Sequence, residues 1–281
     1  MFVTTATEAA PGQLENEDRV LVRGPLVAVF DGVSQPSHLD SGCMHGAAWY
    51  VNMLAEHLAQ AANTDMPLTD LLATAIAHTS AAHADTCDLS NPITPAASVG
   101  IIRETPASLD YLLLCDAYLV TDNGHEVTMT TDLRFAHAIA DIRRQHLNGQ
   151  TEYGSPAHEN ELVDVARQKQ ALTNTPAGYW IAAANPDAAH HAITGTLPLA
   201  GEQAIRRAAL LTDGATRAVD TFALMDWREL LDMISQHGPH ELIRRVRAAE
   251  LADPTGAERP RFKRHDDATI AYATFTQERT T

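Results

Sequence analysis

The sequence has only three cysteines and no long apolar run, and both absences exclude classes of protein. Cys43, Cys87 and Cys115 lie far apart along the chain, which argues against a disulfide framework and against a zinc knuckle. Reduced, mostly buried thiols in a cytoplasm fit this pattern best. No apolar stretch approaches the roughly 20 residues that a membrane span requires, so no span is expected.

Basic residues are also scarce. Lys and Arg number 20 against 36 Asp and Glu, which gives a formal net charge of −16. A nucleic acid held through its phosphates needs a basic face, so no nucleic-acid partner is expected. The first eight residues lack a basic segment followed by an apolar one, which predicts no secretory signal and a cytoplasmic location. An excess of acidic residues keeps many proteins soluble, which is one explanation of the net charge. The other explanation is that bound cations offset part of it.

The periodicity of apolar residues predicts a mixed fold. Strands are expected at 2–7, 19–23, 26–30, 97–103, 109–115, 117–121, 126–130, 179–184, 209–212 and 268–275. Helices are expected at 46–62, 67–83, 134–147, 159–172, 227–235 and 239–251. The strands between 97 and 130 predict an antiparallel meander, with Asp122-Asn123-Gly124 as a hairpin turn.

This order of elements is not the βαβ alternation of a parallel sheet. It predicts an α+β fold in which two antiparallel sheets carry helices on their outer faces. The sequence has no repeat and no low-complexity linker, so residues 1–281 are expected to form one domain.

Four short acidic motifs, spread over almost the whole chain, carry the functional signal. They are Asn16-Glu17-Asp18, Phe30-Asp31-Gly32, Thr212-Asp213-Gly214 and His265-Asp266-Asp267-Ala268-Thr269. An Asp-Gly pair after a strand is by itself most often an ordinary turn. Together, however, carboxylates at strand ends offer the oxygen ligands that Mg²⁺ and Mn²⁺ favour, and two such ions can clamp a phosphoryl group. Gly32 lacks a Cβ, which lets its carbonyl approach a cation closely.

In order and spacing, these motifs resemble the metal-dependent serine/threonine protein phosphatases of the PPM or type 2C family, and bacterial members in particular. Two further segments are similar to family motifs: 96–100 to a Ser-containing strand, and Leu114-Cys115-Asp116-Ala117 to the Gly-Asp turn that follows it. The resemblance runs from about residue 3 to 276 and implies a four-layer αββα sandwich.

The resemblance also implies roles for individual residues. Asp31 would bridge two Mg²⁺ or Mn²⁺ ions, the Gly32 carbonyl would bind one of them, and Asp213 and Asp266 would hold the other. Glu17 and Asp18 would orient waters, and Asp116 would serve a third, weaker ion. Asp31, Asp213 and Asp266 are thus the expected catalytic residues. A metal-bridging hydroxide would attack phosphoserine or phosphothreonine of a protein substrate, and a Ser/Thr kinase is an implied partner.

Several positions depart from the family pattern. The family's phosphate-binding Arg falls on Gln13, the His after Asp-Gly on Val33, and the Arg of the Gly-Asp turn on Tyr118. Arg19, Arg134 and Arg217 are candidates to replace the missing Arg, although each is expected to be an ordinary surface residue. Two alternatives therefore stay open: a weak or inactive phosphatase-like binding module, and a phosphatase for small molecules.

Overall fold

The computed structural model of the protein describes residues 1–36, 39–147 and 151–275. Its strands are β1 (Phe2–Glu8), β2 (Asp18–Arg23), β3 (Leu26–Gly32), β4 (Ala97–Glu104), β5 (Ser108–Leu114), β6 (Tyr118–Asp122), β7 (Val127–Thr131), β8 (Ile193–Pro198), β9 (Arg207–Leu211) and β10 (Ala268–Thr274). They form two antiparallel sheets. The β10 sheet has the order β1-β10-β9-β6-β7, and the β3 sheet has the order β2-β3-β4-β5-β8.

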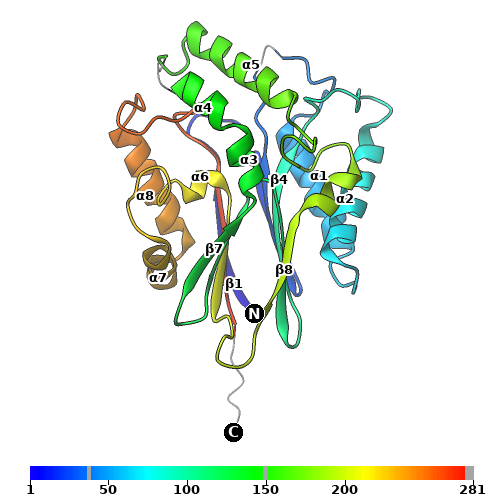
Figure 1. Ribbon diagram of the computed structural model, residues 1–281, viewed down its shortest axis with the longest axis vertical. Coiled ribbons are helices and arrows are strands. Elements are labelled where there is room, and N and C mark those ends of the chain that lie inside the picture. The colour runs from blue at the N-terminus through cyan, green and yellow to red at the C-terminus, as the bar shows by residue number, and fades with distance from the viewer. Residues whose placement is uncertain (37–38, 148–150, 276–281) are drawn as a thin grey trace.

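Helices cover the outer face of each sheet, so the molecule has four layers (Figure 1). In chain order the helices are α1 (Ala47–Gln60), α2 (Leu68–His83), α3 (Leu133–Ala138), α4 (Ala140–Leu147), α5 (Pro156–Gln170), the 3₁₀ helix η1 (Pro186–His191), α6 (Asp213–Thr216), α7 (Trp227–His237) and α8 (Pro239–Ala252). α1 and α2 pack on the β3 sheet, and α7 and α8 pack on the β10 sheet. The expected αββα arrangement is therefore confirmed.

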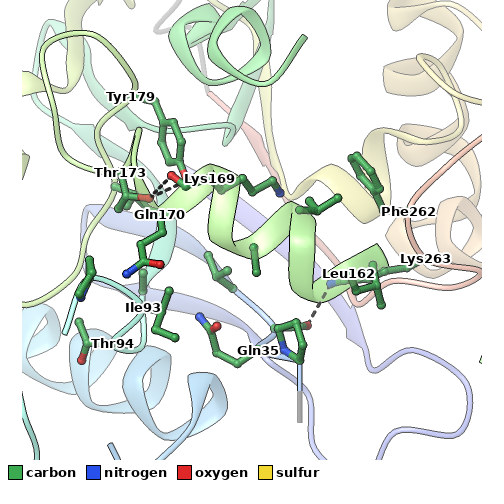
Figure 2. A pocket seen from close by; sticks show the side chains of 18 of the residues that line it. Gln35, Ile93, Thr94, Leu162, Lys169, Gln170, Thr173, Tyr179, Phe262 and Lys263 are labelled. Atoms are coloured by element: carbon green, nitrogen blue, oxygen red, sulfur yellow. Dashed lines mark hydrogen bonds between the residues drawn. The ribbon is translucent and has the colours of Figure 1, made fainter. Parts of the chain in front are cut away.

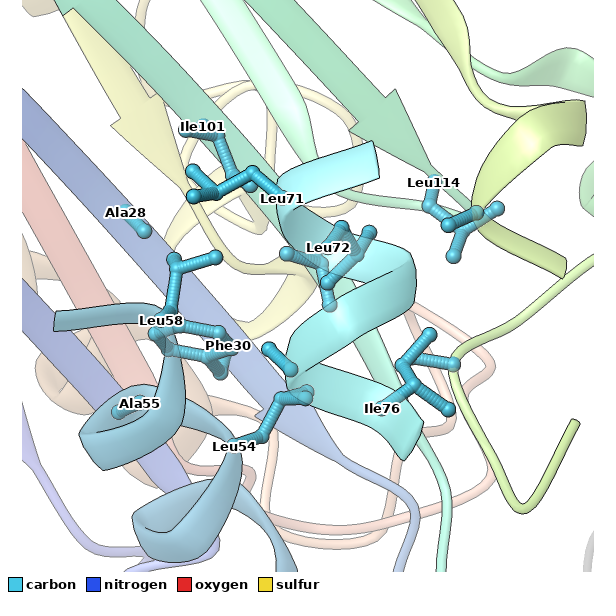
Figure 3. Packing of buried hydrophobic residues seen from close by; sticks show 14 of the residues in the cluster. Ala28, Phe30, Leu54, Ala55, Leu58, Leu71, Leu72, Ile76, Ile101 and Leu114 are labelled. Atoms are coloured by element: carbon cyan, nitrogen blue, oxygen red, sulfur yellow. The ribbon is translucent and has the colours of Figure 1, made fainter. Parts of the chain in front are cut away.

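Strand β3 shows why its sequence is a continuous apolar run. Leu26, Ala28 and Phe30 pack with α1 and α2, as Figure 3 shows for Ala28 and Phe30, whereas Val27 and Val29 face the other sheet. Side chains alternate between the two faces of a strand, and both faces are covered here, so every position from 26 to 30 is buried. The same holds for β10, where Ile270 packs with the α7 and α8 layer and Ala271 packs between the sheets.

The expected meander is wrong at its centre. β4 and β5 lie in the β3 sheet, but β6 and β7 lie in the β10 sheet, so the chain crosses between sheets at 115–117. Cys115 makes this crossing with a φ of 63°, a left-handed conformation that a continuing strand does not adopt. The hairpin turn at 122–124 is confirmed, with Gly124 at a φ of 90°.

Two other expectations fail. The segment 179–184 is not a strand and makes only isolated β-bridges. The N–H of Ile181 donates to the side chain of Asn174 at 2.8 Å and not to the backbone of a neighbouring strand. The helix expected at 134–147 is divided into α3 and α4 at Ile139, which is 2% exposed. Strand β8, which ends at Pro198 on the sheet edge, was not expected at all.

Helices α3, α4 and α5 lie across one end of the sandwich, above the ends of the strands (Figure 1). Among the described residues, no helix is both long and apolar enough to cross a membrane.

Candidate metal centre

Acidic side chains from distant parts of the chain meet at the end of the sandwich beneath α3 and α5. They line a cavity of about 420 Å³, here called the acidic cavity. The expected metal ligands that line its wall are Asp31, Gly32, Asp116, Asp213 and Asp266. Glu17 and Asp18 lie directly behind this wall, because Asp18 is the cross-strand partner of Asp31 in the β2–β3 ladder.

Asp31 stands at the end of β3, where the two sheets come together. The backbone N–H of Asp213, which follows β9 of the other sheet, donates to Oδ2 of Asp31 at 3.4 Å. Gly32 comes next, and its N–H donates to the Glu17 carbonyl at 3.0 Å. A Cβ at position 32 would lie 2.6 Å from that carbonyl oxygen, so only glycine fits.

The last two motifs pack backbone against backbone. A Cβ on Gly214 would overlap the Asp267 carbonyl, which explains the glycine after Asp213. Asp267 does not line the cavity. Its carboxylate accepts the N–H of Ala10 at 2.6 Å and that of Glu17 at 2.5 Å, which holds the first motif against the last. Asp267 is thus a positioning residue for both motifs.

Hydroxyl groups hold the remaining predicted carboxylates in place. Ser98 donates to Asp116 at 2.5 Å, and Thr212 donates to Asp18 at 2.7 Å. Ser34 donates to Glu17. Each hydroxyl contacts only one of the two oxygens of its carboxylate.

Crowding of the carboxylates raises their pKa values. Burial, followed by the charges of Asp213, Asp18 and Asp116, holds the pKa of Asp31 well above its ordinary value. Burial and the charge of Asp266 raise the pKa of Asp213 to about 7. A nearby positive charge would offset the repulsion among these carboxylates, and their oxygen atoms are the ligands that Mg²⁺ and Mn²⁺ prefer. The residues present therefore fit a centre of hard divalent cations.

Asp266 differs from the other carboxylates because two cationic side chains already contact it. Lys263 Nζ donates to Oδ1 at 3.0 Å and Arg217 donates to Oδ2 at 2.8 Å. Burial alone would raise the pKa of Asp266, but Lys263 and Arg217 lower it below its ordinary value. Sequence reasoning missed Lys263, whose only signal was its place three residues before Asp266.

The three arginines considered as phosphate ligands lie in different environments. Arg19 is exposed on β2, and Arg134 pairs with Asp132 at 2.5 Å. Arg217 was expected at the surface, but it is 7% exposed and lines the acidic cavity. It is held from behind by Glu250, a fully buried carboxylate that also accepts from Arg247 and contacts His265.

A second cavity of about 410 Å³, here called the side cavity, adjoins the acidic cavity and shares Ser34, Lys169 and Lys263 with it. Figure 2 shows α5 along the side cavity, with Gln35, Ile93 and Thr94 facing it. Gln13, which stands at the family's Arg position, is exposed and lines the side cavity, not the acidic one. Lys169 lines both the acidic cavity and the side cavity, and its burial there lowers its pKa.

No family model matches the chain, and neither does any curated protein. Solved structures match over nearly their whole length. The serine/threonine phosphatase PstP/Ppp of Mycobacterium tuberculosis is 16% identical, with 98% of each chain covered and a TM-score of 0.56. Stp1 of Staphylococcus aureus is 13% identical, over 98% of this chain and 94% of its own, with a TM-score of 0.55. The protein has the fold of the PPM-type serine/threonine phosphatases.

The PPM resemblance that the acidic motifs indicated is thus confirmed by the solved structures. One of these is the catalytic domain of PstP in complex with two manganese ions, 16% identical over 97% of each chain at a TM-score of 0.56. A bacterial serine phosphatase, 12% identical with both chains fully covered, has a TM-score of 0.59. In the present PPM fold, Asp31, Asp213 and Asp266 all reach the same cavity.

Proposed function

We propose that this protein is a metal-dependent phosphatase that hydrolyses phosphoserine or phosphothreonine in proteins. The observation that supports this most is the convergence of Asp31, Asp213 and Asp266 on one cavity from segments that lie far apart in the sequence. The PPM-type fold supports it independently. A cytoplasmic location and a Ser/Thr kinase that phosphorylates the same substrates belong to the same proposal.

The carboxylates have separate parts in this proposal. Asp31 and the Gly32 carbonyl would hold one ion, Asp31, Asp213 and Asp266 would hold the second, and Asp116 would serve a third. Mg²⁺ or Mn²⁺, when bound, supplies a Lewis acid that lowers the pKa of water and offsets phosphate charge. Glu17 and Asp18, fixed by Ser34 and Thr212, would accept hydrogen bonds from ordered water at the centre.

Lys263 is our candidate for the phosphate contact that Gln13 cannot make. Its ammonium group lies where the acidic and side cavities meet, between Ser34 and Asp266. In this proposal the Lys263 ammonium would leave Asp266, whose oxygen would then be free to hold a cation, and would donate to a phosphoryl oxygen. Arg217, with Glu250 behind it, would keep Asp266 oriented during this exchange.

One observation favours a second candidate function, a phosphatase-like module that binds but does not turn over. Both oxygens of Asp266 are engaged by Lys263 and Arg217, so Lys263 stands in for a metal ion at this carboxylate. If that ion pair persists in solution, divalent cations bind weakly and catalysis is slow.

The test is phosphatase activity on a generic aryl phosphate, with Mn²⁺, with Mg²⁺ and with a chelator, in the wild type and in Asp213→Asn. We expect metal-dependent turnover that falls in the variant by more than the ~10–100-fold typical of an outer-sphere ligand. A phosphopeptide panel against small phosphate esters then separates a protein phosphatase from a small-molecule one. Metal binding by calorimetry without turnover on any of these substrates would support the binding module instead.

A further inference from the structure

A second group of metal-binding side chains lies away from the acidic cavity, at the end of the α1–α2 pair. It consists of Cys43, His45, His83 and Cys87, whose ligand atoms all lie within 4.8 Å of one another. Cys43 Sγ is 3.6 Å from His45 Nδ1 and 3.4 Å from His83 Nδ1, and Cys87 Sγ is 3.3 Å from His45 Nδ1. We refer to these four residues as the Cys₂His₂ cluster.

These three S···N separations are close to the S···N distance in a tetrahedral zinc site. With Zn–S of about 2.3 Å and Zn–N of about 2.0–2.1 Å, a tetrahedral site places sulfur and nitrogen about 3.6 Å apart. The observed S···N distances are 3.3 to 3.6 Å. Two thiolates and two imidazoles in this geometry favour zinc, whereas the all-carboxylate site favours magnesium or manganese.

We propose that the Cys₂His₂ cluster binds one zinc ion in a structural site. The protein supplies all four ligands, which leaves no open position for substrate, and closed sites of this kind hold a fold together. Each cysteine gives up its proton on binding, so zinc affinity should fall at acid pH.

The fold builds this cluster from two short segments. Cys43 and His45 directly precede α1, and His83 is the last residue of α2. The N–H of Cys87 donates to the His83 carbonyl at 3.0 Å, which turns the chain back and puts Cys87 beside His83. Since α1 and α2 form a hairpin, the start of one and the end of the other lie at the same end, and zinc would join them.

The histidine rings are held by packing, and the Nδ1 atom of each contacts a cysteine of the cluster. His45 stacks on Trp49 with ring centroids 4.2 Å apart, and His83 lies 4.9 Å from the same ring. His83 is 2% exposed, and within the described residues its Nε2 has no hydrogen-bond partner. Its Nδ1 points at Cys43. A buried imidazole whose polar contact is with a thiol is explained if that nitrogen binds a metal.

A zinc ion here would also stiffen one wall of the side cavity. The segments that carry the cluster are linked by the N–H of Asp88, which donates to the Gly42 carbonyl at 2.8 Å, and by Asn91, which donates to the Asp40 carbonyl at 2.9 Å. The segment that follows Cys87 supplies Ile93 and Thr94 to the cavity wall. This role is independent of the proposed phosphatase chemistry.

The first experiment measures zinc in the intact protein by elemental analysis after dialysis against Mg²⁺ without a strong chelator. We expect about one zinc per chain, retained in Asp213→Asn, which removes a ligand of the acidic site only. The double variant Cys43→Ser/Cys87→Ser should lose it. The control His78→Ala, an exposed histidine on α2 outside the cluster, should keep it. Substitution by Co²⁺ should give the visible absorption of a tetrahedral thiolate site.

A second measurement on the wild type does not depend on the folding of a variant. Alkylation should modify Cys43 and Cys87 only after a chelator removes the metal, and the chelator should lower the melting temperature. Zinc that remains in the double cysteine variant but disappears in Asp213→Asn would overturn the proposal. So would a wild-type protein that takes up no zinc, or a Cys43–Cys87 disulfide in protein prepared under reducing conditions.

Discussion

The backbone N–H of Asp213 donates to Oδ2 of Asp31 at 3.4 Å, and this contact joins the two sheets at the acidic cavity. Asp31 lies one residue before the end of β3, and Asp213 follows β9 of the β10 sheet. The site therefore depends on how the two sheets pack, because each sheet brings only part of the ligand set.

The raised pKa values at this junction predict an unusual pH dependence of stability without metal. The pKa of Asp213 is about 7, so between about pH 4 and 7 the folded protein keeps a proton that the unfolded chain has released. The free energy of unfolding should then fall as pH rises through this window, by on the order of 1 kcal/mol per pH unit.

Thermal unfolding in a chelator at about pH 5 and about pH 7.5 measures this slope. Asp213→Asn, which cannot titrate, should flatten it. Added Mn²⁺ should stabilise the protein more at the higher pH, because the ion binds the ionised carboxylates. The same pH slope in the chelated wild type and in Asp213→Asn would contradict the raised pKa of Asp213.

Lys263→Met tests the two functional readings against each other. If Lys263 contacts phosphate, its loss removes a charge-assisted hydrogen bond of roughly 1.5–3 kcal/mol and lowers kcat/KM by about 10–100-fold. If Lys263 instead blocks the centre, the variant should bind Mn²⁺ more tightly and turn over faster. Arg264→Met removes an exposed neighbouring cation and should change neither quantity much. Steady-state kinetics and calorimetry read out both.

Glu250→Gln should destabilise the protein strongly. Glu250 is fully buried and neutralises Arg217, and loss of one partner of a buried pair typically costs 3–5 kcal/mol. Urea unfolding measures the cost. The matched change Glu241→Gln affects pairs with the more exposed Arg244 and Arg245 and should cost much less, because solvent screens exposed ion pairs. Equal costs for the two variants would show that Arg217 does not rely on Glu250.

Gly214→Ala should impair both folding and activity. The new Cβ would overlap the Asp267 carbonyl, and relief requires the last motif to move away from Asp213. We expect a loss of about 1–3 kcal/mol in stability together with weaker Mn²⁺ binding. Gly201→Ala, where φ is 83° but nothing lies within 4 Å, should show backbone strain alone and leave Mn²⁺ binding intact. Melting temperature and metal titration distinguish the two.

The strands that the sequence predicted best are those buried on both faces. β3 carries an unbroken apolar run and β10 an alternating pattern, each beside an acidic motif, so strand and site were visible together. The edge strand β8 was missed because it is only half buried and contains Gly195 and Pro198, which disfavour strands. The crossing at Cys115 was missed because a single left-handed residue leaves no periodic signal.

The cationic part of the acidic site was harder to predict than the carboxylates. Arg217 and Lys263 look like surface residues in the sequence. Arg217, at the end of α6, reaches Asp266 across 49 residues of sequence, whereas Lys263 contacts Asp266 from three residues away. The Cys₂His₂ cluster was not predicted, because the wide spacing of the cysteines argued against a zinc site. Only the α1–α2 hairpin brings His45 Nδ1 and Cys87 Sγ to 3.3 Å from each other.

By itself the sequence determined the αββα layers and the acidic motifs at the strand ends, because burial on two faces and turn chemistry are local properties of a strand and its neighbours. Only the tertiary structure decided which cations contact Asp266 and that two cysteines and two histidines meet. The contact of Arg217 with Asp266 and that of His45 with Cys87 join segments separated by tens of residues, and the distance between such segments is set by packing and not by local sequence.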